Sequence, residues 1–333
     1  MIQTVGIIGS GSWGTALAQV FSEKCSTVKL WGRNKKLIES INKEKINFKY
    51  LPEIILNENI KGTTDLEEIF LTSDIIVIAI PTQVIRETLK DIKLNLKDKI
   101  IISASKGIEI DSLKLVSDIL NEVLDINEHK SFVLSGPSFA KEVAQKLPTA
   151  ITLAGNIELG KILQRLLTTT YFRIYTSNDI KGAEIGGAVK NVIAIATGVS
   201  DGLGFGNNAR ASLITRGLYE MTKLAKVYGG KSETLYGLAG LGDLVLTATG
   251  NLSRNRKFGY LIGKGLSINK ALEEVNQVVE GVKTVKAIKK LIDIYNLELP
   301  ISEMVYRVVY ENLPINEAVK SLMTRELKSE NIY

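Results

Sequence analysis

Hydrophobic and polar positions divide the chain into two halves with different patterns. Up to about residue 180, short apolar runs rich in β-branched residues alternate with segments whose apolar positions recur at helical spacing. This alternation predicts a parallel sheet flanked by helices. The expected strands are Val5–Gly9, Val28–Trp31, Ile75–Ile80, Ile100–Ala104, Phe132–Leu134, Ala150–Leu153 and Phe172–Tyr175. The expected helices are Gly14–Lys24, Lys35–Lys43, Thr82–Ile92, Ser112–Leu124 and Ile157–Leu167.

An uninterrupted apolar strand in the first half and a purely helical second half support a division into two domains. The segment Ile75–Ile80 is apolar at every position, as a central parallel strand buried on both faces should be. Beyond Asp179 the strand pattern stops, and only helical patterns follow. The expected helices are Ala183–Ser200, Asn208–Tyr228, Arg256–Gly263, Asn269–Val275, Gly281–Tyr295, Ile301–Tyr310 and Asn316–Leu327. Pro300 and Pro314 stand where a helix start or a break is expected. We therefore predict an α/β domain over residues 1–180 and an all-α domain over residues 181–333.

Composition limits the class of protein further. A chain of 333 residues with 45% hydrophobic and 23% charged residues is typical of a soluble protein with two cores. No apolar run approaches the roughly 18 to 20 residues that span a bilayer. A strand pattern begins at once at the N-terminus, which leaves no room for a signal peptide. Cys25 is the only cysteine, so we expect a reducing cytoplasm, no internal disulfide and no dedicated metal site.

The balance of charge disfavours nucleic acid as a partner. The formal charge of +6 comes from 42 basic and 36 acidic residues spread over polar faces, without a basic arm or interleaved aromatic residues. A mildly positive protein would favour anionic small molecules by steering. The single histidine, His129, lies in a polar turn. If the protein transfers protons, a residue other than histidine must carry them.

A glycine-rich turn follows the first strand. Gly9-Ser10-Gly11-Ser12-Trp13-Gly14 has a strand before it and a helix after it, the context in which such a turn admits a pyrophosphate at the positive end of a helix. An unoccupied tight turn is the alternative interpretation. Arg33 stands at the end of the second strand, where an acidic residue usually accompanies NAD and an arginine accommodates the 2′-phosphate of NADP. Since an arginine also stacks on adenine or simply starts a surface helix, NAD and NADP both stay open.

Lys190 stands in the nearly uncharged stretch 185–196. Burial of an unpaired ammonium costs several kcal/mol, so a partner or a function is expected there. Small residues share its helical face, namely Gly186, Gly187, Ala194 and Thr197. Desolvation lowers the pKa of a lysine and would let Lys190 exchange a proton near neutral pH. A lysine that extends its ammonium from a packed helix to the surface is the alternative.

Further candidates lie at strand ends and in glycine-rich segments. Lys106 in Ser105-Lys106-Gly107 follows a strand, at the edge where ligands of α/β sheets bind. Gly136-Pro137-Ser138 also follows a strand, although Ser138 could cap the next helix. Asp243 lies in Leu238–Leu244, read as a glycine-punctuated turn. It would give Lys190 a counter-ion, but an isolated aspartate is more often a helix cap.

The segment Ser253-Arg254-Asn255-Arg256 offers a hydroxyl, an amide and two guanidinium forks within four residues. Arginine forks and amide donors are suited to a phosphate group. A basic helix start on the surface is the alternative.

These motifs occur together in one known family. The order Gly9–Gly14, Ser105–Gly107, Gly136-Pro137-Ser138-Phe139-Ala140, Ala188–Asn191, Gly240–Leu244, Ser253–Asn255 and Val279–Gly281 resembles the NAD(P)-dependent glycerol-3-phosphate dehydrogenases of the bacterial biosynthetic type, from residue 5 to about residue 325. The resemblance implies a Rossmann-like NAD(P)-binding domain before a helical substrate-binding and catalytic domain. It also implies hydride transfer between NADPH or NADH and dihydroxyacetone phosphate, which yields glycerol 3-phosphate for phospholipid synthesis in the cytoplasm.

The same resemblance assigns residues. Lys190 is implied as proton donor or acceptor. The implied substrate contacts are Lys106, Gly136, Ser138, Lys190, Asn191, Asp243, Ser253, Arg254 and Asn255. The implied cofactor contacts are Gly9, Gly11, Ser12, Trp13, Gly14, Arg33, Lys106, Ala140, Arg254, Val278 and Glu280.

Two other functions stay open from the residues alone. A lysine-dependent hydroxyacid or sugar-acid dehydrogenase would prefer a carboxylate to a phosphate. A non-catalytic redox sensor would bind NAD(P) but would not need Lys190, Asp243 and Arg254 together. The apolar helices of the second half suit a homodimer as well as the core of a monomer.

Overall fold

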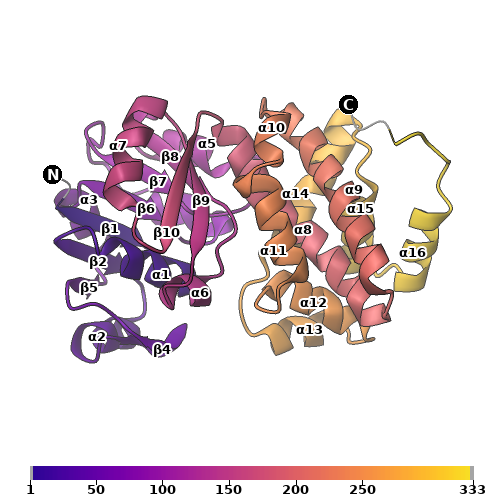
Figure 1. The fold of residues 1–333 in the computed structure, drawn as a ribbon, viewed down its shortest axis with the longest axis horizontal. Helices are drawn as coiled ribbons and strands as arrows, with labels where there is room; N and C mark the ends of the chain where they lie inside the picture. The colour runs from indigo at the N-terminus through magenta and orange to yellow at the C-terminus, as the bar shows by residue number, and fades with distance from the viewer. Residues whose placement is uncertain (1–2, 331–333) are drawn as a thin grey trace. The chain divides into compact units, whose positions relative to one another are not determined.

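The computed structural model describes residues 3–330 (Figure 1). These residues form two compact units. Unit 1 comprises the chain up to Lys106 together with Leu115–Ala183, and unit 2 comprises Gly107–Lys114 together with the chain from Glu184 onward. Two side chains of unit 2 hold the short inserted segment. The hydroxyl of Tyr228 donates to the carbonyl oxygen of Leu113 at 2.6 Å, and the ammonium of Lys290 donates to that of Ile110 at 2.8 Å.

Unit 1 is built on an eight-stranded sheet in the order β10-β9-β8-β7-β6-β1-β2-β5. Its strands are β1 (Thr4–Ile8), β2 (Thr27–Trp31), β5 (Ile60–Thr63), β6 (Ile75–Ile78), β7 (Ile100–Ser103), β8 (Ser131–Ser135), β9 (Thr149–Ala154) and β10 (Phe172–Ser177). All neighbours pair in parallel except β8 and β9, which are antiparallel. The mostly parallel sheet expected from the sequence is confirmed. The strand order reverses between β1 and β6, so ligands should bind at the carboxyl ends of these strands.

Helices and a small hairpin complete unit 1. The helices are α1 (Ser12–Phe21), α2 (Lys35–Lys43), α3 (Leu66–Thr72), α4 (Ile85–Leu89), α5 (Val116–Val123), α6 (Ala140–Ala144) and α7 (Ile157–Leu167), with short 3₁₀ turns at Thr82–Val84 and Glu128–Lys130. The hairpin pairs β3 (Ile46–Asn47) with β4 (Leu51–Ile55). Along β6, Ile75 and Val77 pack into one hydrophobic core, whereas Ile76 and Ile78 pack into another. The central strand is therefore buried on both faces, as its apolar run predicted.

Several predicted elements of unit 1 are wrong in their bounds or were missed. The helix expected over Ser112–Leu124 begins only at Val116, because Leu113 adopts a left-handed φ of 59°. The helix expected over Thr82–Ile92 is a 3₁₀ turn followed by the five residues of α4. The sequence analysis gave no bounds for β3, β4, β5, α3 or α6. These are short elements with many exposed polar positions, so their hydrophobic periodicity is weak.

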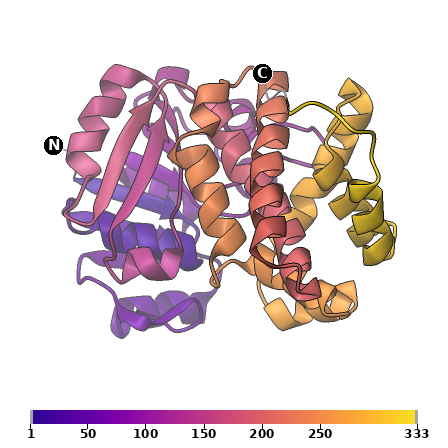
Figure 2. The ribbon, with the colours of Figure 1, turned by 45° about the vertical axis from the view of Figure 1, so that its right-hand side comes forward.

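From Glu184 onward the regular elements of unit 2 are all helices among the described residues, and Figure 2 shows them from a second direction. The long helix α8 (Ile180–Leu203) leads into it from unit 1. The others are α9 (Gly206–Val227), α10 (Ser232–Leu235), a π-helical segment η3 (Leu238–Gly242), α11 (Asp243–Thr249), α12 (Arg254–Gly263), α13 (Ile268–Val275), α14 (Glu280–Tyr295), α15 (Pro300–Tyr310) and α16 (Ile315–Met323). Pro300 is the first residue of α15, as expected. Among residues 3–330, no helix has the length and apolar character needed to cross a membrane.

A buried carboxylate from another helix caps the start of α15. The residue before this helix, Leu299, has no capping side chain. Instead Glu220 on α9 accepts hydrogen bonds from the backbone amides of Ile301 at 2.6 Å and Ser302 at 3.0 Å, and from the Ser302 hydroxyl at 2.7 Å. These amides are among the donors that a helix leaves unpaired at its N-terminus. Glu220 thus links α9 to α15.

Burial raises the pKa of Glu220 from 4.5 to about 7, although the three donors lower it. The folded protein therefore binds a proton that the unfolded chain releases between these values. We expect the free energy of unfolding to fall as pH rises from about 4.5 through 7.

The substitution Glu220→Gln removes this titration and should flatten that part of the pH dependence, whereas Glu220→Ala leaves the α15 amides unpaired and should cost about 2 kcal/mol. Urea unfolding of the parent and both variants near pH 5 and pH 8 measures both effects. Equal slopes against pH in the parent and Glu220→Gln would contradict the assignment.

Candidate active site

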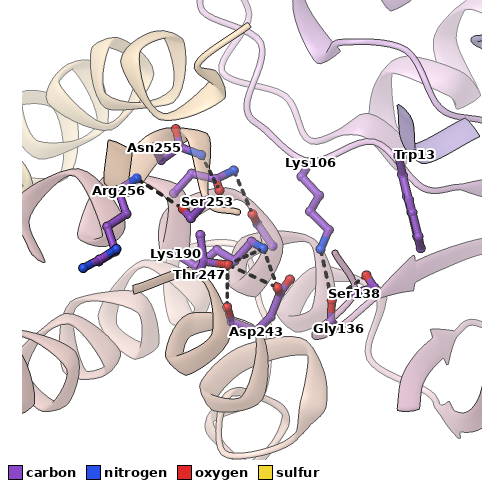
Figure 3. Close-up of polar contacts among 12 residues, drawn as sticks. Trp13, Lys106, Gly136, Ser138, Lys190, Asp243, Thr247, Ser253, Asn255 and Arg256 are labelled. Carbon is purple, nitrogen blue, oxygen red and sulfur yellow. Dashed lines mark hydrogen bonds and ion pairs between the residues drawn. The ribbon is translucent and has the colours of Figure 1, made fainter. Parts of the chain in front are cut away.

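A buried ion pair joins α8 to α11 in unit 2. The ammonium of Lys190 contacts the Oδ1 atom of Asp243 and donates to the hydroxyl of Thr247 at 2.8 Å (Figure 3). Lys190 is 7% exposed and Asp243 only 1% exposed, so water screens the pair little. The expected partnership of Lys190 with Asp243 is confirmed, and the surface-directed lysine is excluded. Thr247 was missed by the sequence analysis, although its place one helical turn after Asp243 was a usable signal.

Close backbone packing sets the position of Asp243. A Cβ atom on Gly186 of α8 would lie 2.2 Å from the carbonyl oxygen of Ala239, and one on Gly240 would lie 2.1 Å from that of Leu235. The η3 segment therefore lies directly against α8, one turn before Lys190. The turn expected at Leu238–Leu244 is instead a π-helical segment that continues into α11. Asp243 is the first residue of α11 rather than its cap, so its carboxylate is available to Lys190.

Two asparagines connect the helix of Lys190 to two others. The side-chain amide of Asn255 donates to the Oδ1 atom of Asn191 at 2.9 Å, and its own oxygen accepts from the backbone amide of Gly281 at 2.9 Å. Both asparagines are buried. This network joins α8, α12 and α14 next to Lys190, and it ties the two asparagines implied as substrate contacts to each other.

The start of α12 carries the basic candidates. Ser253 is buried and caps the helix by accepting from the backbone amide of Arg256 at 3.2 Å. Arg254 is exposed, and one of its Nη atoms donates to Gln277 at 3.2 Å. Arg256 is directed elsewhere, because its Nε atom donates to Asp201 at 2.7 Å. Of the two arginine forks considered for a phosphate, Arg254 is therefore the better placed.

The glycine turn of unit 1 is packed tightly at two glycines and open at the third. A Cβ on Gly14 would lie 1.8 Å from the carbonyl oxygen of Gly9, and one on Gly9 would lie 2.4 Å from that of Ala79. A Cβ on Gly11 would meet no atom within 4 Å. Since Gly11 directly precedes α1, this open space lies at the positive end of a helix, as a pyrophosphate requires. The turn therefore fits a dinucleotide.

Buried Asn47 supports this turn from the β3–β4 hairpin. Its side-chain amide donates to the carbonyl oxygen of Ser10 at 3.0 Å and to the Thr15 hydroxyl at 2.7 Å. The hydroxyl of Ser12 reaches the same hairpin at the carbonyl oxygen of Tyr50, at 3.4 Å. Sequence analysis missed Asn47, because it lies more than thirty residues from its partners in sequence.

Three candidates of unit 1 gather at the carboxyl ends of β7 and β8. Lys106 and Ser138 both donate to the carbonyl oxygen of Gly136, at 3.3 Å and 3.0 Å (Figure 3). Ser138 does not cap α6, whose preceding residue is Phe139. The indole Nε1 of Trp13 donates to the carbonyl oxygen of Ala104 at 3.2 Å, just after β7. This places Trp13 and Lys106 at the same edge of the sheet.

The remaining cofactor candidates are at the surface or partly buried. Arg33 is exposed next to Asn34, which caps α2. Ala140 is the first residue of α6, and Val278 is half exposed before α14. Burial raises the pKa of Glu280 to about 7, while the charge of Arg254 lowers it. Arg254 and Glu280 therefore lie close enough to interact across the starts of α12 and α14.

Other reactive groups are poor candidates for chemistry. His129 is exposed in a 3₁₀ turn. Cys25 is buried, and burial raises the pKa of its thiol to about 11, so it stays an uncharged thiol near neutral pH. Among residues 3–330, no cluster of His, Cys, Asp or Glu is suited to a metal ion.

Fold and site together define a class. A doubly wound sheet with an open glycine turn at its switch point is a dinucleotide-binding domain. The helical unit that follows holds a lysine paired with a buried carboxylate. This combination is typical of dehydrogenases that use a nicotinamide cofactor and a side chain as proton donor.

Comparisons with known proteins identify the family. The model of the NAD-dependent glycerol-3-phosphate dehydrogenase N-terminus matches residues 4–158, and that of the C-terminus matches residues 179–320. The chain therefore belongs to the NAD-dependent glycerol-3-phosphate dehydrogenase family. A relative from Geobacter sp. (strain M21), named glycerol-3-phosphate dehydrogenase [NAD(P)+], is 44% identical over 335 residues and 100% of both chains.

Solved structures agree with this assignment. The crystal structure of glycerol-3-phosphate dehydrogenase from Coxiella burnetii is similar with a TM-score of 0.90 and 39% identity, over 97% of this chain and 99% of that chain. The glycerol-3-phosphate dehydrogenase of Saccharomyces cerevisiae is similar with a TM-score of 0.82 and 31% identity, over 96% and 99% of the two chains. The expected family and fold class are both confirmed.

The glycine turn yields a prediction that separates binding from packing. Gly11→Ala adds a methyl group in open space and at an ordinary φ of −75°, so it should leave the melting temperature unchanged and weaken NADPH and NADH binding about tenfold or more. Gly14→Ala should lower the melting temperature, because its Cβ overlaps Gly9.

Thermal melts and titration of cofactor fluorescence measure the two effects. Unchanged cofactor affinity in a folded Gly11→Ala variant would contradict the placement of the pyrophosphate.

Proposed function

We propose that this chain reduces dihydroxyacetone phosphate reversibly to glycerol 3-phosphate with NADPH or NADH. The buried pair of Lys190 with Asp243, in a chain that belongs to the glycerol-3-phosphate dehydrogenase family, carries this proposal. The cofactor, when bound, supplies or accepts the hydride. The protein has to bind the phosphate, orient the ketone and deliver one proton.

Lys190 delivers that proton. Reduction of a ketone places negative charge on its oxygen, and an ammonium nearby both stabilises this charge and can transfer a proton to it. Asp243 is the counter-ion of the lysine in this buried place, and Thr247 accepts a second of its hydrogen bonds. These two contacts fix the direction of the ammonium, which we propose faces the C2 oxygen of the substrate.

Phosphate binding falls to the start of α12 and to the edge of the sheet. Arg254 supplies a fork suited to phosphate oxygens. We assign Ser253, Asn255 and Asn191 to the same substrate. In unit 1, Lys106, Gly136 and Ser138 supply a further cation, a backbone position and a hydroxyl. The common contact of Lys106 and Ser138 with Gly136 supports this grouping.

The cofactor contacts follow from unit 1 and from the start of α14. The turn of Gly9, Gly11 and Gly14 takes the pyrophosphate, with Ser12 and Trp13 on the first turn of α1. Arg33 accommodates the adenosine end, whether or not it carries a 2′-phosphate. Further contacts come from Lys106, Ala140, Arg254, Val278 and Glu280. We thus propose that the N-terminal domain, residues 1–180, binds NAD(P) and that residues 181–333 provide the helical substrate-binding and catalytic domain.

We also propose a biological setting for this reaction. A role in supplying glycerol 3-phosphate for phospholipid synthesis fits the reaction. A cytoplasmic location fits a chain whose one cysteine is a buried thiol. A homodimer is one assembly that the helices of the second half could form, and sedimentation would distinguish it from a monomer.

A substrate comparison tests the proposed reaction. The purified protein should oxidise NADPH or NADH with dihydroxyacetone phosphate and not with dihydroxyacetone at the same concentration. The reason is that substrate binding depends on the contact between Arg254 and the phosphate group. The ratio of the rates with NADPH and NADH shows whether Arg33 favours a cofactor with a 2′-phosphate. Turnover of small 2-ketoacids in place of the phosphorylated ketone would contradict the proposal and favour a hydroxyacid dehydrogenase.

Removal of the proton donor should abolish turnover and leave cofactor binding intact. We expect Lys190→Ala to lower kcat by about a thousandfold, within the range of general acid catalysis. Thr247→Val should lower kcat about tenfold, because one lysine N–H loses its acceptor, while Thr247→Ser should stay near the parent. Steady-state kinetics with a fluorescence titration of NADPH measures both, and parental turnover in Lys190→Ala would refute this role.

Arg254 should act on binding more than on the chemical step. Arg254→Lys keeps a charge but not the fork, and we expect it to raise the KM for dihydroxyacetone phosphate about tenfold with a smaller change in kcat. Lys257→Gln on the exposed face of the same helix is the matched control. An unchanged KM in Arg254→Lys and Arg254→Ala would remove Arg254 from the phosphate site.

A further inference from the structure

Helices α8 and α12 touch through their backbones. A Cβ on Gly198 of α8 would lie 2.1 Å from the carbonyl oxygen of Arg256, and one on Gly259 of α12 would lie 2.1 Å from that of Ile195. Gly202 and Gly263, one turn further along each helix, meet each other in the same way. No side chain separates the two helices here, so their spacing cannot relax by a change of rotamer.

The contacts also fix how the helices are aligned. Asn191 bonds to Asn255 at one end, Gly198 approaches Arg256 further along, and Gly202 meets Gly263 at the other end. Both residue numbers rise together, so α8 and α12 run in the same direction along this contact. The start of α12, with Arg254 and Asn255, therefore lies beside the turn of α8 that carries Lys190.

A single buried carboxylate fastens this contact. Asp201, near the end of α8, is 5% exposed at its side chain. Its Oδ2 atom accepts a hydrogen bond from the Nε atom of Arg256 at 2.7 Å and lies 2.7 Å from Nη2 in the same ion pair. Its Oδ1 atom accepts from Arg210 of α9, at 3.0 Å from Nε and 2.6 Å from Nη2. Arg256 thereby has its fork engaged by Asp201 rather than by a phosphate.

We propose that Asp201 is a positioning residue, which holds Arg256 and so fixes Arg254 and Asn255 at the start of α12 relative to Lys190. This inference rests on the proposed function, in which Arg254 and Asn255 bind the phosphorylated substrate. A phosphate group held at the wrong distance from the proton donor loses the orientation on which the reaction depends. The glycine contacts set the distance between the two helices. The ion pair of Asp201 with Arg256 sets the position of the first turn of α12 along the axis of α8.

The test compares variants at the two ends of this ion pair. Asp201→Asn and Arg256→Gln should each raise the KM for dihydroxyacetone phosphate about tenfold, with a smaller fall in kcat. Inorganic phosphate should act as a competitive inhibitor, and its inhibition constant should rise by the same factor in these variants. The double variant should resemble either single variant, because the two residues act as one unit.

Arg210→Gln is the matched control. It removes a partner of the same carboxylate, but one that comes from α9 and does not carry the start of α12. We expect a loss of thermal stability with a KM within about twofold of the parent. Arg256→Lys, which keeps the charge without the fork, replaces Arg256→Gln if that variant does not fold, and it should also raise KM.

Two results would overturn the inference. If Arg256 bound phosphate directly, Asp201→Asn would release it and leave KM unchanged or lower, while Arg256→Gln would raise KM. If Arg210→Gln raised KM as much as Asp201→Asn, the effect would be general loss of structure. A parent protein without turnover of dihydroxyacetone phosphate would instead refute the proposed function, and the inference with it.

Discussion

The buried contact of Lys190 with Asp243 is the interaction on which the arrangement of unit 2 depends. An ammonium and a carboxylate that leave water together lose hydration worth several kcal/mol each, and good geometry is needed to recover it. The structure provides that geometry with Thr247 as a second acceptor and with glycines that bring η3 against α8. Removal of either charge would take away the buried counter-ion of the other, so the pair constrains the sequence around it.

Helix α8 organises the rest of the site in unit 2. Successive turns of this helix contact η3 at Gly186, α11 at Lys190, α12 and α14 at Asn191, and α12 again at Gly198. A side chain at Gly186 or Gly198 would overlap the backbone of the neighbouring segment. This accounts for Gly186 and Gly198 on α8, which allow close helix packing on either side of Lys190.

The sequence predicted the features that depend on local pattern and failed where distant residues meet. The apolar run of β6 and the glycine turn before α1 were both predicted, because periodicity and turn chemistry are local. The glycines of η3 were read as a turn, since π-helical backbone has no distinct sequence signal. Thr247 resembles any buried helix threonine until Lys190 is placed beside it. Arg256 was considered for a phosphate because its partner Asp201 lies 55 residues away.

We propose that Asp243 holds Lys190 in the direction needed for proton transfer. The most direct test is the variant Asp243→Asn, which preserves size and removes the charge. We predict that its kcat/KM for dihydroxyacetone phosphate falls about a hundredfold or more, while its affinity for NADPH stays that of the parent. A folded Asp243→Asn variant with turnover within a few-fold of the parent would contradict the account.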